Sequence, residues 1–342
     1  MSQPDHAAFT SARENRLGAL REFMERHYLH FNAREVVEAS KAYESHLAAG
    51  GKMLVAMAGA MSTGELGIIL SRMIREGKVH AISCTGANLE EDLFNLVAHD
   101  EYEIVPDWRA LNARDEKALY ERGMNRVTDT CIPETVMRHL ESRLVSCWAR
   151  AAESGERRTP AGFLFEVLDD PTLEQHYQID PANSWMLAAK EMQIPVFSPG
   201  WEDSTTGNIF AANVMNGNVC SHLCVKTGTE QFQHLMEWYQ AHDNRGTDKP
   251  SVGFFQIGGG IAGDFSICAV PALIQDLKRE DTPFWGYFAQ ISDAPASYGG
   301  YSGAVPNEKI TWGKLDVETP KFVIQSDASI VAPLIFGYVL GD

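Results

Sequence analysis

Residues 53–64 indicate the fold most directly, with the sequence Met53-Leu54-Val55-Ala56-Met57-Ala58-Gly59-Ala60-Met61-Ser62-Thr63-Gly64. Its leading residues are apolar and indicate a short buried strand, while the glycines and hydroxyl side chains after them indicate a tight loop. A helix is expected next, over 65–76. A strand, a glycine-containing loop and a helix in this order are typical of one unit of a parallel sheet.

The same order recurs along the chain. A strand over 81–84 is followed by a turn at Thr85-Gly86-Ala87-Asn88 and a helix over 89–97, and a strand over 252–257 enters a glycine-rich segment. Further strands are expected over 194–197, 286–291 and 322–325, and further helices over 138–155, 183–192, 228–242 and 328–340. We therefore predict an α/β fold with a Rossmann-like parallel sheet flanked by helices.

The N-terminal part is expected to be a helical extension. Apolar residues recur at spacings of three and four over 9–49, and Gly50-Gly51 ends the pattern. No linker or compositional break follows. We therefore expect a helical extension over residues 1–50 and a single catalytic domain over 51–342.

Composition excludes several classes of protein. The chain has 342 residues, 44% hydrophobic and 22% charged, as expected for a globular protein. A net charge of −17 argues against a nucleic-acid partner and favours small cations. No apolar run reaches the length of about 18 residues that a membrane helix needs, and the N-terminus is polar, so we expect a cytoplasmic protein with no membrane partner. The scattered cysteines form no C-x-x-C pair, and no metal site is predicted.

Three loops after expected strands suit a nucleotide. Residues 258–263 match G-x-G-x-x-G, but the acid expected after the following strand is missing, so this is not the ordinary dinucleotide loop. Residues 59–64 and 85–87 carry glycines and hydroxyl groups suited to phosphate, although each alone is more typical of a helix cap. Glu90-Glu91-Asp92 opens a helix, where it either interacts with the helix dipole or holds a substrate ammonium.

A candidate nucleophile lies in the C-terminal run 302–315. Lys314 follows Trp312 by two residues, with only Gly313 between them, so its amine can lie against an apolar ring. Removal from water disfavours the ammonium form, and a neutral lysine amine forms imines. The alternative is an ordinary surface lysine after a strand.

With these residues in view, the chain resembles the deoxyhypusine synthase family. The matching segments, in order, are 58–64, 85–93, 194–199, 257–260, 302–304 with 312–314, and 326–329. The run Ser-Gly-Ala to Trp-Gly-Lys, followed by Asp-Ala-Ser, is specific to that family. Together the segments span most of residues 50–342.

The resemblance implies a reaction and roles for named residues. It implies an NAD-dependent transferase of alkyl (aminobutyl) groups, a homotetramer with sites at a dimer interface, in which Lys314 carries the imine and Trp312 forms its apolar wall. The predicted catalytic residues are Lys314, Trp312 and Glu308. The predicted substrate-binding residues are Glu90, Glu91, Gly259, Asp264, Tyr298, Tyr301 and Ser302. The predicted NAD-binding residues are Ser62, Thr63, Gly64, Thr85, Gly86, Ala87, Asp327 and Ala328.

The chain departs from the family where the amine is recognised. Asp264 stands where family members carry a histidine, and tyrosines, among them Tyr298 and Tyr301, replace an acidic run. Ser221-His222 lies near the point where the family carries the acid that holds the adenine-side ribose. We therefore predict that transfer is retained while the substrate has changed: the acceptor is a small free amine, as in homospermidine synthesis from putrescine, or the donor is agmatine, whose guanidinium stacks on tyrosine.

Three alternatives remain at this level. One is a true deoxyhypusine synthase, which modifies a lysine of a translation factor. The second is a non-catalytic NAD-binding scaffold. The third is an ordinary dehydrogenase, which would accumulate NADH.

Overall fold

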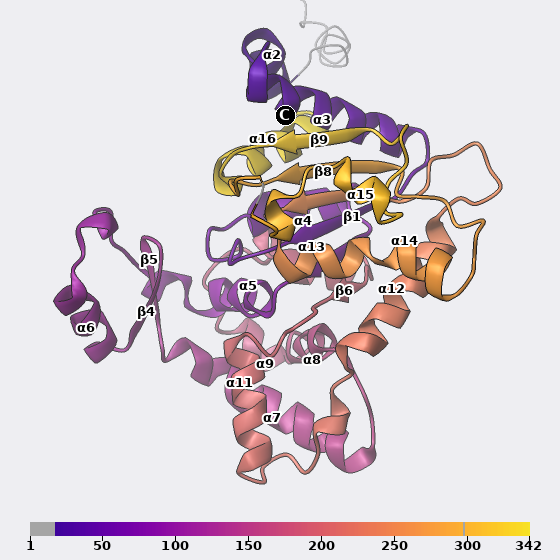
Figure 1. The fold of residues 1–342 in the computed structure, drawn as a ribbon. Helices are drawn as coiled ribbons and strands as arrows, with labels where there is room; N and C mark the ends of the chain where they lie inside the picture. The colour runs from indigo at the N-terminus through magenta and orange to yellow at the C-terminus, as the bar shows by residue number, and fades with distance from the viewer. Residues whose placement is uncertain (1–17, 297) are drawn as a thin grey trace, which may run out of the picture.

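A six-stranded, all-parallel sheet forms the centre of the computed structural model, which describes residues 18–296 and 298–342 (Figure 1). The strand order is β6-β2-β1-β7-β8-β9. The strands are β1 Met53–Met57, β2 Ala81–Cys84, β6 Val196–Phe197, β7 Gly253–Ile257, β8 Tyr287–Ile291 and β9 Lys321–Ile324. Every residue of β1, β2, β7 and β8 is buried, as expected for strands covered on both faces. The predicted α/β class with a parallel sheet is confirmed.

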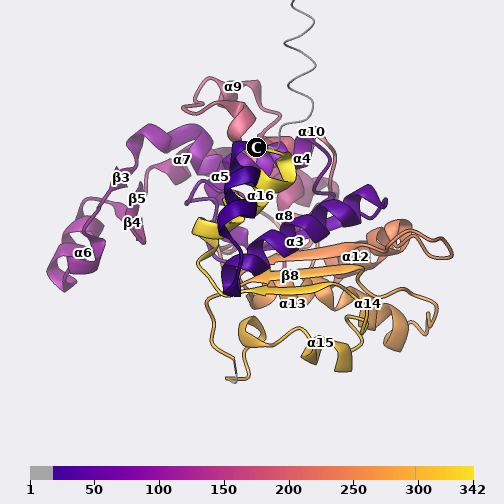
Figure 2. The same ribbon diagram turned by 90° about the horizontal axis from the view of Figure 1, so that it is seen from above.

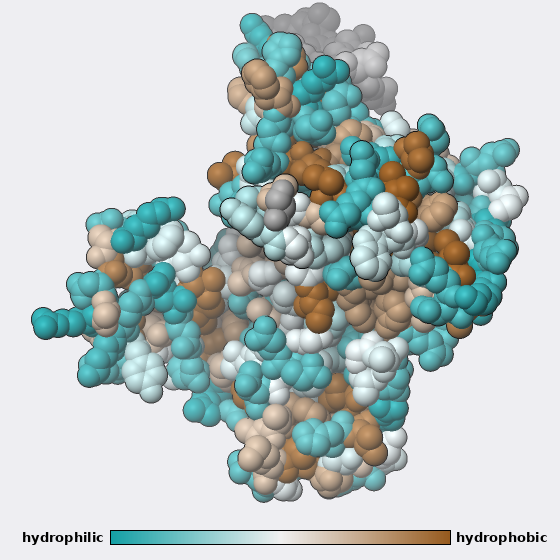
Figure 3. Space-filling view, viewed as in Figure 1, coloured by the Kyte–Doolittle hydropathy of each residue, from teal (hydrophilic) through white to brown (hydrophobic). Residues whose placement is uncertain are grey.

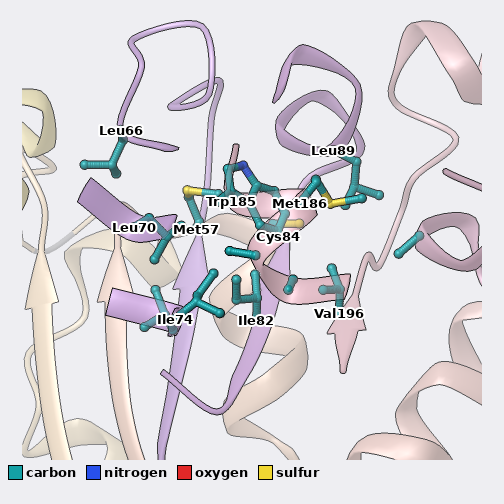
Figure 4. Close-up of a cluster of buried hydrophobic side chains, with 14 of the residues drawn as sticks. Met57, Leu66, Leu70, Ile74, Ile82, Cys84, Leu89, Trp185, Met186 and Val196 are labelled. Atoms are coloured by element: carbon teal, nitrogen blue, oxygen red, sulfur yellow. The ribbon is translucent and has the colours of Figure 1, made fainter. Parts of the chain in front are cut away.

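Helices cover both faces of the sheet (Figure 2). On one face, α3 Phe31–Ala48, α4 Gly67–Arg75 and α16 Ala328–Leu340 pack on alternate strand residues such as Val55. On the other face, α12 Gly228–His242 and α13 Gly260–Ile267 pack on their neighbours, such as Leu54. Figure 4 shows part of the first cluster, where Met57 and Ile82 of adjacent strands meet Leu70 of α4.

Among the remaining helices, that over 185–191 joins the first cluster through Trp185 and Met186 (Figure 4). The helices are α2 Ala19–His27, α5 Gly86–Ala98, α6 Ala113–Glu121, α7 Val136–Ser154, α8 Pro160–Val167, α9 Pro171–Glu174, α10 Trp185–Glu191, α11 Thr205–Met215, α14 Ala269–Pro271 and α15 Glu308–Thr311. A second, antiparallel sheet has the order β3-β5-β4, with β3 Glu103–Ile104, β4 Met124–Val127 and β5 Thr130–Pro133. With α6 it forms an arm that projects from the body (Figure 1).

Most predicted elements are confirmed with small shifts, and three predictions need correction. The predicted N-terminal helix is interrupted at 28–30, and residues 9–17 lie outside the described part. Helix α5 begins at Gly86 rather than after a turn, because the Thr85 side chain accepts a hydrogen bond from Asn88 N and caps the helix. The antiparallel arm was missed. The division at residue 50 stays a prediction, although Tyr287 of β8 donates a hydrogen bond to Ala39 O of α3 across it.

None of the helices within 18–296 and 298–342 combines the length and apolar character that crossing a membrane requires.

Candidate active site

A cavity of about 530 Å³ lies on the α12 and α13 face of the sheet. The residues that line it come from α12, α13, the helical segment 268–276 that follows α13, and the segment 299–314. They are Phe232, Asp264, Cys268, Pro271, Ala272, Gln275, Asp276, Gly299, Gly300, Tyr301, Gly303, Ala304, Glu308, Lys309, Trp312 and Lys314. Figure 3 shows this face of the molecule, on which hydrophilic and hydrophobic side chains are interspersed. Val305 and Trp312, on either side of α15, are both exposed.

Lys314 is buried in the wall of this cavity. Its Nζ donates a hydrogen bond to Asp264 Oδ1 of α13 at 3.0 Å and lies 5.3 Å from the centre of the Tyr301 ring. A left-handed turn at Gly313, with φ +67°, places it there by reversing the chain after α15. The backbone N–H of Lys314 then bonds to Lys309 O, so the turn is closed.

The aromatic ring beside the Lys314 amine belongs to Tyr301 rather than to Trp312. Trp312 is 63% exposed and stands at the edge of the cavity, because the Gly313 turn directs the two side chains apart. The Tyr301 hydroxyl donates to Gln256 Oε1 of β7 at 2.7 Å, and burial raises the pKa of Tyr301 well above its ordinary value. Tyr301 therefore presents a neutral, fixed ring to the amine. The expectation that Trp312 forms the apolar wall is corrected in this respect.

A second lysine, Lys309 of α15, shares the cavity and was missed from the sequence. It is 2% exposed, its Nζ donates to Ala304 O at 3.1 Å, and it lies 4.9 Å from the centre of the Tyr301 ring. Burial lowers the pKa of Lys309 to about 8, and the charge on Lys314 adds to this effect. Nothing in the local pattern distinguishes Lys309 from a surface lysine, so no sequence signal marks it.

Other predicted substrate-binding residues occupy different places. Glu308 lines the cavity, whereas Tyr298 is exposed and is not among its lining residues. Gly259 and Ser302 lie behind the wall, where Ser302 Oγ accepts a hydrogen bond from Gly260 N at 3.2 Å. They join the loop after β7 to the segment that carries Tyr301.

The α5 carboxylates Glu90 and Glu91 do not line this cavity and accept hydrogen bonds from backbone N–H groups instead. Glu90 accepts bonds from Thr205 N and Thr206 N at the first turn of α11, at 2.9 and 2.7 Å. Glu91 accepts from Thr63 N at 3.3 Å, and burial raises the pKa of Glu91 to about 7. A carboxylate at a helix N-terminus is stabilised by unpaired N–H groups, which explains the position of Glu90. Contact of Glu90 or Glu91 with a substrate ammonium stays a prediction.

All eight predicted NAD-binding residues lie at the carboxyl edge of the sheet, after β1, β2 and β9, but several face inward. Ser62 Oγ donates to Asn88 O and accepts from Trp185 Nε1. Thr85 and Asp327 cap helices. Gly64 lies in the turn before α4, Gly86 and Ala87 lie in the first turn of α5, and Ala328 begins α16. The sequence suggested that the Ser62 hydroxyl is available to a phosphate group. In the structure this hydroxyl is already hydrogen-bonded to Asn88 and Trp185.

The same edge nevertheless suits a dinucleotide. Gly59 and Gly260 both have φ +62°, and a Cβ built on Gly260 would meet nothing within 4 Å, so the backbone there is open. The buried Thr63 Oγ1 has no hydrogen-bond partner among the described residues. Exposed backbone at the end of a parallel strand is the usual approach for a pyrophosphate, which binds N–H groups and needs no cation. The residues present fit such a group.

The fold and the cavity together define a Rossmann-like α/β protein with two buried lysines in one cavity on a face of its sheet. The chain matches the family model for deoxyhypusine synthase over residues 20–339 and belongs to that family.

Relatives are similar in sequence along most of their length. A deoxyhypusine synthase-like protein of Nostoc sp. is 26% identical over 94% of this chain and 81% of its own. Another, from Cyanothece sp., is 28% identical over 84% of this chain and 70% of its own. A protein of Methanosarcina mazei described as "Probable deoxyhypusine synthase 2" is 24% identical over 89% of this chain and 81% of its own.

The fold also resembles a solved structure. A crystal structure described as a candidate deoxyhypusine synthase from Entamoeba histolytica aligns with a TM-score of 0.56 at 13% identity, covering 99% of this chain and 96% of that one. At this identity the likeness shows the fold alone.

Proposed function

We propose that this protein is an NAD-dependent transferase that moves an aminobutyl or guanidinobutyl group from a polyamine to an acceptor amine through an imine on Lys314. The acceptor we propose is a small free amine, as in homospermidine synthesis. The observation that carries this proposal is the buried Lys314 amine, paired with Asp264 in a cavity of about 530 Å³ in a member of this family.

NAD, when bound, would take a hydride from the carbon next to the donor nitrogen and return one at the end of the reaction. The open backbone at Gly59 and Gly260 and the unpartnered Thr63 hydroxyl support its placement at the carboxyl edge of the sheet. The chain's own residues then have to bind, align and deprotonate amines and keep water away from an imine.

The resting site holds Lys314 away from reaction. An ammonium paired with Asp264 has no free electron pair and cannot attack a carbon atom. A cationic amine that enters the cavity competes for the same carboxylate, which releases Lys314. The Lys314 ammonium gives its proton to Asp264, the neutral amine attacks the imine carbon of the oxidised donor, and the remainder of the donor takes up that proton and leaves as an amine. The acceptor amine then displaces Lys314 from the same carbon.

Charge and shape support a small cationic substrate. Asp264 is the carboxylate bonded to the reacting lysine, and the net charge of the chain is −17. The Tyr301 ring is fixed by its bond to Gln256 and offers a face on which a planar guanidinium can stack. These features favour agmatine or putrescine over a protein lysine. From the family we also expect a cytoplasmic homotetramer with sites at a dimer interface.

The test is to incubate the purified protein with NAD and each amine, alone and in pairs, and to resolve products by mass spectrometry. Borohydride treatment with a labelled donor should attach the label to Lys314, and Lys314→Arg should abolish it. Transfer only to a translation-factor lysine would replace the free-amine proposal with deoxyhypusine synthase activity. A wild-type protein that traps nothing with any amine would favour the scaffold, and net NADH accumulation would indicate a dehydrogenase.

A further inference from the structure

Lys309 is a buried amine that the chemistry above leaves without a role. Its Nζ lies between two rings, 4.9 Å from the centre of Tyr301 and 5.1 Å from that of Phe288. Its hydrogen bond goes to the neutral oxygen of Ala304. Within 18–296 and 298–342 no carboxylate forms an ion pair with it, whereas Lys314 has Asp264. The two lysines of one cavity therefore have different environments.

The two environments affect the charge of the two amines in opposite directions. The carboxylate at 3.0 Å stabilises an ammonium on Lys314, while desolvation and the nearby positive charge of Lys314 disfavour one on Lys309. Glu308 and Asp264 act in the opposite direction with smaller effect, and burial together with the Lys314 charge brings the pKa of Lys309 to about 8. The cavity thus holds one amine that is paired with a carboxylate and one amine, without such a pair, whose pKa burial lowers to about 8.

A cationic donor in the cavity further disfavours the charged form of Lys309. A protonated Lys309 would repel an incoming ammonium across a water-poor cavity, whereas a neutral Lys309 offers it an electron pair. The donor, for its part, cannot lose hydride from the carbon beside a protonated nitrogen, because no electron pair is available to form the carbon–nitrogen double bond. A base that faces the same cavity removes both obstacles at once.

We propose that Lys309 is a second catalytic lysine, the base that accepts the proton of the donor ammonium before the imine forms. In this step the N–H bond of the donor breaks, the proton joins the electron pair on Lys309 Nζ, and the donor nitrogen keeps its own pair. No oxidant is consumed, and the proton returns to the product amine. The inference rests on the proposed function, of which it names the proton acceptor.

The test follows the pH dependence of donor trapping on Lys314 by borohydride, in the full-length protein with NAD. In the wild type the trapping rate should rise with pH to a plateau, with its midpoint near pH 8. Lys309→Met should lose this rise and be slower by about 100-fold or more at the plateau, since general base catalysis contributes about 10²–10⁴-fold. Lys309→Arg, which stays charged, should resemble the methionine variant. Lys117→Met, on exposed α6, is the matched control and should match the wild type.

Each outcome has a distinct meaning. A wild type that traps nothing overturns the proposed function and the inference with it. Normal trapping on Lys314 with an unchanged pH profile in a folded Lys309→Met overturns the role of Lys309 alone, as does full activity in Lys309→Arg or label on Lys309 itself.

A second measurement needs neither NAD nor turnover and serves if the variants fail to fold. Competitive labelling of the wild type with acetic anhydride, read by peptide mass spectrometry, reports the protonation of each lysine. A midpoint near pH 8 for Lys309 supports the proposal. A midpoint near the ordinary lysine value of about 10.4 overturns it.

Discussion

Gly259→Ala is expected to disturb the cavity of the two lysines although Gly259 does not line it. A Cβ built on Gly259 would lie 1.9 Å from Ser302 Oγ, 2.5 Å from Ser302 Cβ and 2.7 Å from Ser302 Cα. The hydroxyl can rotate away, but the Cα is backbone and cannot. The segment 301–304 must therefore move, and Tyr301 moves with it.

The size of the effect follows from this contact. Overpacking of a close-packed interior costs about 1–3 kcal/mol, and here we expect about 2 kcal/mol in the free energy of unfolding. The centre of the Tyr301 ring lies 4.9 Å from Lys309 Nζ and 5.3 Å from Lys314 Nζ. A misplacement of about 1 Å in a catalytic group can reduce the rate about 100-fold, so donor trapping on Lys314 should fall by about that factor.

The assay combines urea unfolding, followed by tryptophan fluorescence, with borohydride trapping. Gly228→Ala at the start of α12 is the matched control, because a Cβ there would meet nothing within 4 Å. Ser302→Gly removes the Oγ and Cβ atoms of Ser302, two of the three atoms that the new Cβ would meet. The double variant Gly259→Ala with Ser302→Gly should therefore be more stable than Gly259→Ala alone. If Gly259→Ala is as stable as the wild type, or if Ser302→Gly does not reduce its loss of stability, the predicted clash with Ser302 is wrong.

Three further predictions concern charged and buried polar groups. Asp264→Asn removes the partner of the Lys314 ammonium, and because the Asp264 side chain is half exposed we expect a loss of about 1 kcal/mol in stability by urea unfolding, with a higher KM for cationic amines. Burial raises the pKa of Glu91 to about 7, so its contribution to stability is present at acid pH and is lost as pH rises towards 7. In Glu91→Gln the free energy of unfolding should therefore fall less between pH 4.5 and 7, by up to about 3 kcal/mol. Part of the fall should remain, because burial also raises the pKa of Asp92, to about 6. Asn88→Ala removes a fully buried amide that bonds the loop after β1 to α5, and should cost about 3 kcal/mol in chemical unfolding.

Exposed residues supply matched controls for these variants. Asp248→Asn, Glu153→Gln and Asn216→Ala change the same groups on the surface and should leave stability within about 0.5 kcal/mol of the wild type. Equal effects in a variant and its control would contradict the structural explanation. An unchanged pH slope in Glu91→Gln would show that Glu91 does not titrate as its burial implies.

Several elements were predictable because their signals are local. The strand 81–84 and the helices 228–242 and 328–340 have the predicted bounds. Helix α12 begins at a capping box of Thr227 and Glu230, and α16 begins at the cap of Asp327. A buried parallel strand also reads directly as an apolar run. The antiparallel arm escaped prediction because β3 and β4 are short, half of their residues are polar and none of them is buried.

Some residues of the candidate site were also predictable from local motifs, and others were not. The specific run around Trp312 and Lys314 carries the family resemblance, and the family is confirmed. The neighbours of the Lys314 amine were less accessible to prediction. Asp264 pairs with it from α13, 50 residues away in the chain, and Tyr301 rather than Trp312 supplies the ring.

The parallel α/β sheet, its glycine loops and the lysine to which the family assigns the chemistry were all predictable from the amino-acid sequence. These depend on apolar runs, caps and short motifs, whose signals lie within a few neighbouring residues. The shared cavity, and the different partners of the two amines in it, Asp264 for Lys314 and a backbone oxygen for Lys309, follow from the tertiary structure. The protonation of a lysine depends on its burial and on the charges around it, and here those come from β8, α13 and the segment 301–304, which the strand order brings together.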